Sequence, residues 1–139
     1  MIRIKGYLEL KTKIMKLLLW SIGKQNESFV KEGIEDFTNR ILKYFPCEWK
    51  LIAPPKNAAA LSNTELKEAE SKMLLNCLDP IDYMILLDER GKMITSPGLA
   101  KLIDERAINR TKRVHFVIGG AYGVTDAVRK RANFIWQLS

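Results

Sequence analysis

Short apolar runs alternate with amphipathic stretches along this chain, and the alternation predicts the order of its secondary-structure elements. Five runs are rich in apolar residues and end at polar, glycine or proline residues, which is typical of buried β-strands. They cover residues 15–22, 47–52, 83–87, 114–118 and 134–138. Strands that alternate with helices predict an α/β fold in which a parallel sheet carries helices on both faces.

Four helices are expected around these strands, each beginning at a polar residue that can cap it. The expected caps are Asn26, Ser62 or Asn63, Ser96, and Thr125 or Asp126. Pro46 is expected to end the first helix. The inner faces of the second and third helices are expected at Leu66, Ala69, Met73 and Cys77 and at Leu99, Leu102 and Ile103, because these residues recur at helical spacing.

One domain is expected over residues 15–139. Residues 1–14 do not fit the strand and helix pattern, and they are interpreted either as an N-terminal extension or as translation begun upstream of a natural start at Met15. The longest apolar run is too short to span a bilayer. The N-terminus also lacks the pattern of a secretory signal, so we expect a cytoplasmic protein.

The charge of the chain favours a polyanionic partner. Lys and Arg number 23 against 16 Asp and Glu, which gives a net charge of +7. Nucleic acid is the first candidate, although a basic composition without a specific partner remains an open alternative. The residues predicted to meet RNA phosphates are Arg106, Arg110, Lys112, Arg113, Arg129 and Arg131, and the alternative for each is a solvated helix face.

Few residues offer metal or nucleophile chemistry. Cys47 and Cys77 form no CxxC pair and His115 is the only histidine, so no metal site is predicted and both cysteines are expected to be buried, reduced thiols. His115 lies inside a predicted strand and is interpreted as a packed side chain rather than a base. Core positions are also expected for the three tryptophans, Trp20, Trp49 and Trp136.

Two loops that follow strands are the candidate site, because ligands of parallel α/β sheets gather at the carboxyl ends of strands. In the first, polar residues 88–92 are expected to end the third strand sharply. Asp88 and Glu89 are its candidate carboxylates, and the alternative for them is loop anchoring beside Arg90. The second is the glycine-rich loop 119–123, which is as easily structural as functional. It matches neither GxGxxG nor the P-loop pattern, so an adenosine that carries a sulfonium amino acid fits better than a nucleoside triphosphate.

Three segments in this order strongly resemble the ribosomal large-subunit methyltransferase H family of the SPOUT superfamily of knotted methyltransferases. They are Met15-Lys16-Leu17 with Gly23-Lys24, Tyr83 to Lys92, and Phe116 to Gly123, within a resemblance that runs from Met15 to Ser139. The resemblance implies a homodimer that uses S-adenosyl-L-methionine to methylate N3 of pseudouridine 1915 in 23S rRNA on the assembled ribosome. It also implies that three loops hold the cofactor, at Leu87, Gly119, Gly120, Gly123, Leu138 and Ser139.

The sequence departs from the family at its C-terminal end. The family continues with Lys-Met-Thr, a histidine-containing turn, a long helix and a tail, whereas this sequence stops at Ser139. We therefore expect an incomplete knot, a weakened cofactor site and no assignable general base. The alternatives are a non-catalytic, rRNA-binding remnant of the same fold and an unrelated nucleotide-binding α/β module.

Overall fold

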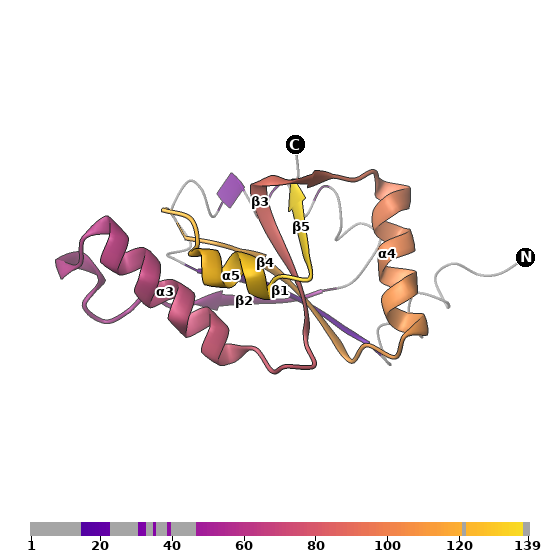
Figure 1. Ribbon diagram of the computed structural model, residues 1–139, viewed down its shortest axis with the longest axis horizontal. Helices are drawn as coiled ribbons and strands as arrows, with labels where there is room; N and C mark the ends of the chain where they lie inside the picture. The colour runs from indigo at the N-terminus through magenta and orange to yellow at the C-terminus, as the bar shows by residue number, and fades with distance from the viewer. Residues whose placement is uncertain are drawn as a thin grey trace, which may run out of the picture.

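A computed structural model describes residues 15–22, 31–32, 35, 39, 47–120 and 122–137. Its elements are β1 (Lys16–Ile22), β2 (Glu48–Ile52), the 3-10 turn η2 (Ala58–Ala60), α3 (Asn63–Cys77), β3 (Tyr83–Met93), α4 (Ser96–Ile108), β4 (Arg113–Ile118), α5 (Asp126–Arg131) and β5 (Phe134–Gln137). All five strands are parallel, in the order β2-β1-β4-β3-β5 (Figure 1). The predicted α/β fold is therefore confirmed. The helix expected from Asn26 and the extension 1–14 fall largely or wholly outside the described residues.

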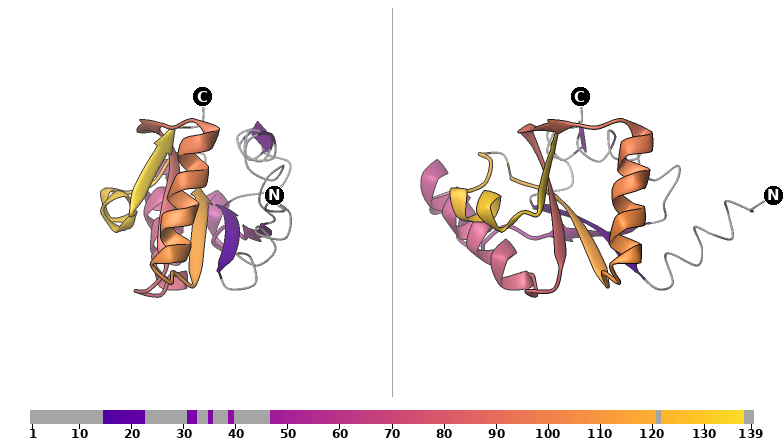
Figure 2. Two further views of the ribbon diagram at one scale, coloured as in Figure 1. Left: turned by 90° about the vertical axis from the view of Figure 1, so that its right-hand side faces the viewer. Right: turned by 45° about the vertical axis from the view of Figure 1, so that its right-hand side comes forward.

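Both faces of the sheet are buried, which explains why its strands read as nearly continuous apolar runs. Alternate residues of β1 point to opposite faces, so Leu17 and Leu19 pack with Leu99 of α4, while Ile22 packs with the face covered by α3 and α5. Figures 1 and 2 show α3 and α5 beside each other and α4 across the strands from them. No described helix is long and apolar enough to cross a membrane.

The start of α3 agrees with prediction, but its buried face agrees only in part. Ser62 forms a capping box with Glu65, in which each side chain accepts a backbone N–H bond of 3.2 Å. Of the predicted inner face, Leu66, Ala69 and Met73 are half-buried and Met73 packs against the core, but Cys77 is exposed, and the fully buried residues of α3 are Glu70, Ser71 and Leu74. The buried face meets a polar loop, where Ser71 Oγ accepts a 3.1 Å bond from the Thr125 N–H.

The cap predicted for α4 was one residue late. Thr95 Oγ1 accepts a 3.1 Å bond from the Gly98 N–H, and Ser96 is already the first helical residue, followed by proline. The expected inner face holds at Leu99 and Ile103, which are buried. In α5 the predicted cap Thr125 is confirmed by its backbone position, although its side chain makes no capping bond.

The polar segment after Leu87 does not end β3. The strand continues to Met93 and pairs with β5 on both sides of an irregularity, since Leu87 and Lys92 are both in register with Trp136. Gly91 allows this, because a Cβ there would lie 2.5 Å from the carbonyl oxygen of Ile135. Close approach of two backbones is a usual reason for glycine inside a strand.

Two core expectations need correction. Trp20 and Trp136 are buried, but Trp49 is 44% exposed, because β2 lies at the edge of the described sheet. The cysteines differ as well: burial raises the pKa of Cys47 to about 12, which leaves it an unreactive thiol, whereas Cys77 is exposed.

A charge network centred on the buried Asp82 joins the amino ends of β3 and β4 to the last residue of α5. The carboxylate of Asp82 accepts a 2.6 Å bond from Arg113 Nε and lies 3.2 Å from His115 Nε2. Asp79 pairs with the same arginine at 2.6 Å, and Arg131 donates to the backbone carbonyls of Asp79 and Asp82. His115 is 2% exposed and contacts the Trp20 ring, so the prediction of a packed histidine is confirmed.

The stability of the protein is expected to fall as the pH drops below about 6.5, the ordinary pKa of histidine. Burial lowers the pKa of His115, and the neighbouring Asp82 carboxylate offsets this only in part, while Arg113 adds to the lowering. The unfolded chain therefore takes up this proton first, so stability is full above pH 6.5 and decreases below it. Urea unfolding between pH 7.5 and 5.5 measures the slope. His115 is the only histidine, so His115→Gln should flatten the curve, and an unchanged slope in that variant would contradict the assignment.

Candidate functional site

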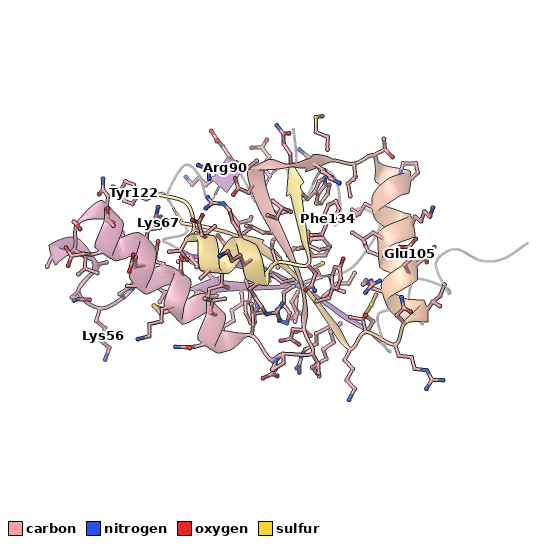
Figure 3. The ribbon with its side chains drawn as sticks, in the orientation of Figure 1. Lys56, Lys67, Arg90, Glu105, Tyr122 and Phe134 are labelled. Carbon is pink, nitrogen blue, oxygen red and sulfur yellow. The ribbon has the colours of Figure 1, made fainter. Side chains whose placement is uncertain are left out.

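A cavity of about 480 Å³ opens at the carboxyl end of β4, beside residues 86–90 of β3. These strands are neighbours in the sheet, with Leu87 in register with Ile118, so the segment after Leu87 and the glycine loop after β4 lie side by side, although the first is part of β3 rather than a loop. Its walls are Leu86, Leu87, Asp88, Arg90, Ile118, Gly119, Gly120, Tyr122, Gly123, Val124 and Arg129. Arg90 and Tyr122 both lie along the upper side of the molecule in Figure 3.

At each glycine of the loop that follows β4, a different physical reason disfavours a side chain. A Cβ on Gly119 would lie 2.8 Å from Val124 Cγ1, and one on Gly120 would collide with the carboxylate of Glu70 on α3. Gly123 has φ +81°, a conformation that other residues rarely adopt, and open space beside it. Its N–H donates a 3.0 Å bond to the Gly120 carbonyl, which closes the turn. The loop therefore folds tightly against Val124 and α3 and presents mostly backbone to the cavity.

Four of the six predicted cofactor residues line this cavity: Leu87, Gly119, Gly120 and Gly123. Leu138 and Ser139 lie outside the described residues. The contribution of Glu70 was missed, because an acidic residue on a helix gives no sign that it will be buried beside a glycine turn.

Asp88 is the charged centre of the cavity wall, and its ion-pair partner is Arg129 rather than Arg90. One carboxylate oxygen accepts a 3.2 Å bond from the backbone N–H of Arg90, and the other lies 3.3 Å from Arg129 Nε. Arg129 also contacts Asp126 at 3.2 Å. Both the Asp88 and Arg129 side chains are mostly buried, at 15% and 21% exposed. The side chain of Glu89 lies outside the described part of the structure.

The basic residues predicted to bind RNA do not form one surface. Arg129 lines the cavity, while Arg113 and Arg131 belong to the network at the opposite rim. Arg106 lies over the Tyr83 ring, 4.6 Å from its centroid. Arg110 and Lys112 are exposed in the turn before β4, and Arg110 has φ 60° where that turn reverses the chain after α4.

The cavity suits an adenosyl ligand in size and in chemistry. Its volume falls in the usual range for small-molecule sites, roughly 300–1,000 Å³. Apolar walls at Leu86, Leu87 and Ile118 can face a base, and the glycine backbone offers amides and carbonyls to polar edges. Among the described residues, no group of three or more His, Cys, Asp or Glu side chains could hold a metal ion.

Two comparisons with known proteins give matches over most of the chain. The family described as "Predicted SPOUT methyltransferase" matches residues 15–139. A protein of Cytophaga hutchinsonii named "Ribosomal RNA large subunit methyltransferase H" is 43% identical over 119 residues, covering 86% of this chain and 76% of that protein. A protein of the same name from Parabacteroides distasonis is 39% identical with the same coverage. Another, from Desulfitobacterium hafniense strain DSM 10664 / DCB-2, is 35% identical over 91% of this chain and 81% of its own length.

Proposed function

We propose a function for this chain from its family: it belongs to the SPOUT methyltransferases, and among them to the ribosomal RNA large subunit methyltransferase H family. The proposed reaction is the transfer of a methyl group from S-adenosyl-L-methionine to N3 of pseudouridine 1915 in 23S rRNA. The observation that carries the proposal is the cavity where Leu87 of β3 and the glycine loop after β4 meet. The walls of this cavity fit an adenosyl group, and the chain belongs to a family of methyltransferases, so the two observations support the same function.

When bound, S-adenosyl-L-methionine supplies a methyl group on a sulfonium whose leaving thioether is neutral. The chain therefore has to place donor and acceptor in line more than to move protons. The Gly120–Gly123 turn is closed by a backbone bond and packed against α3, so its amides are fixed before any ligand arrives. Such fixed backbone groups can hold the adenosyl part without reorganisation.

We also propose that rRNA contacts the predicted basic residues. Arg110 and Lys112 are exposed, so their charges are accessible to phosphates. Arg113 and Arg131 are engaged with Asp79 and Asp82, which reduces what they can offer to RNA. The proposal extends, on the family resemblance, to a homodimer that acts in the cytoplasm on the assembled ribosome.

Direct binding tests the cofactor assignment. In isothermal titration, S-adenosyl-L-homocysteine is expected to bind one site per chain, and a dissociation constant at or below the micromolar level would contradict the expected weakening of the site. Gly120→Ala adds a methyl group that collides with the carboxylate of Glu70, which is 4% exposed, so either that side chain or the loop has to move and binding should weaken at least about tenfold. Gly98→Ala, in α4 and away from the cavity, is the matched control and should bind normally. Equal affinity in all three proteins would place the cofactor elsewhere.

Catalysis and RNA binding are separated by a second measurement. Ribosomes incubated with the protein and methyl-labelled S-adenosyl-L-methionine should gain label in 23S rRNA, at a nucleoside that mass spectrometry identifies as N3-methylpseudouridine. Salt-sensitive rRNA binding without cofactor binding or label would instead support the non-catalytic remnant.

A further inference from the structure

The guanidinium of Arg129 is the recessed cationic group of the cavity. It projects from α5, lines the cavity and is 21% exposed, whereas the other cationic side chain of the wall, Arg90, is exposed. A small ligand inside the cavity can reach Arg129. An RNA phosphate, attached to a bulky chain, reaches Arg90 at the rim more easily.

Arg129 has hydrogen-bonding capacity left over. A guanidinium carries five N–H groups. Within the described part of the chain, its Nε bonds to Asp88 and its Nη1 to Asp126, and no hydrogen bond involves Nη2. The Asp126 side chain is 89% exposed, so that contact is weak and easily exchanged. A planar fork with unused donors is the usual protein partner of a carboxylate.

Asp88 holds the arginine in place. Its carboxylate is 15% exposed, with one oxygen on the Arg90 backbone N–H and the other on Arg129 Nε, so it fixes the base of the guanidinium. Both oxygens of Asp88 are engaged, so the carboxylate can act as a support for the guanidinium. The wall carries one negative charge, on Asp88, against two positive charges, on Arg90 and Arg129. It therefore attracts an anionic group.

We propose that Arg129, positioned by Asp88, binds the carboxylate of the amino-acid part of the methyl donor. This inference rests on the proposed function, because it assumes that an adenosyl amino acid occupies the cavity. Arg129 is thus a ligand-binding residue and Asp88 a positioning residue. The competing assignment for Arg129 is an rRNA phosphate.

Decarboxylated S-adenosylmethionine tests the inference in the wild-type protein, because it lacks only the carboxylate. S-adenosyl-L-methionine should bind at least about tenfold more tightly than the decarboxylated compound in isothermal titration, as expected when a hydrogen bond to a charged group is lost. Equal affinities would overturn the inference without any substitution. If neither compound nor S-adenosyl-L-homocysteine binds, the proposed function fails and this inference fails with it.

Substitutions assign the effect to residues. Arg129→Met should weaken S-adenosyl-L-methionine binding about tenfold and leave binding of the decarboxylated compound unchanged. The ratio of the two affinities, S-adenosyl-L-methionine over the decarboxylated compound, should therefore fall to about one. Arg129→Lys, which keeps the charge, should recover part of the ratio, and Asp88→Asn should reduce it partway. Lys130→Met is the matched control, because Lys130 is an exposed cation of the same helix that does not line the cavity, and this variant should keep the wild-type ratio. Circular dichroism verifies the fold of each variant. Loss of rRNA binding in Arg129→Met with an unchanged ratio would assign Arg129 to phosphate instead.

Discussion

Asp82→Ala is expected to destabilise the protein by about 3–5 kcal/mol, the usual result of removing one partner of a buried ion pair. The Asp82 side chain is 3% exposed and accepts bonds from Arg113 Nε and from the Asp79 backbone N–H, with His115 beside it. Without the carboxylate, the Asp79 N–H and the buried His115 ring lose their partner, and Arg113 keeps only its pair with the exposed Asp79. Urea unfolding at pH 7, followed by circular dichroism, measures the loss.

The chain contains a matched control for this prediction. Asp79 pairs with the same Arg113 at the same 2.6 Å, but its side chain is 66% exposed. Asp79→Ala should therefore cost no more than about 1 kcal/mol, as exposed ion pairs do. Equal losses in the two variants would show that burial does not set the strength of these pairs.

The stabilisation by the Asp82 carboxylate is also expected to depend on pH in the acid range. Burial by itself would raise the pKa of Asp82, but the bonds from the Asp79 N–H and Arg113 and the nearby His115 outweigh it and hold the pKa below its usual 3.8. A carboxyl with a lowered pKa stabilises the fold above pH 3.8, and that contribution disappears as the pH falls through the lowered value. The difference between wild type and Asp82→Ala is therefore expected to persist to pH 4 and to shrink only below it.

The strands were predictable because burial on both faces leaves a strong local signal. Each of the five runs chosen from the sequence coincides with a strand, and the segment after Leu87 and the glycine loop, which were predicted to meet, do line one cavity, although the first is part of β3. Parallel neighbours bring their carboxyl ends to one rim. Loops that follow two strands therefore identify the candidate site before any contact is known.

What the sequence could not predict depends on contacts between distant segments. The burial of Ser71 beside Leu74 on α3 goes with a hydrogen bond from the loop that contains Thr125, a contact that helical spacing alone does not reveal. Nothing in the sequence around Arg129 distinguishes it from the other basic residues, and only the fold brings it next to Asp88. The end of β3 was misplaced because its polar residues pair with β5, more than forty residues later in the chain.

Gly91→Ala should destabilise the protein by about 3 kcal/mol, the upper end of the usual cost of overpacking. The added Cβ would lie 2.5 Å from the Ile135 oxygen and 2.7 Å from the Trp136 nitrogen. These are backbone atoms of a paired strand, so no side chain can rotate to make room. Relief requires β5 to move away from β3 and to uncover Trp136, which is 1% exposed. Urea unfolding measures the loss, and a red-shifted tryptophan fluorescence in the folded variant would report the separation.

Gly98→Ala separates this steric effect from the general effect of replacing glycine. Its Cβ would meet Thr95 Oγ1 at 3.3 Å and Ile94 Cβ at 3.6 Å, distances that small adjustments absorb. Inside α4, alanine is favoured over glycine by roughly 1 kcal/mol, so the variant should be close to neutral or slightly stabilised. Among the described glycines only Gly123 has a positive φ, so at Gly91 space alone forbids a side chain. A Gly91→Ala protein as stable as Gly98→Ala would mean that β3 and β5 do not approach each other beyond Leu87, and that the polar residues after it form a separate turn.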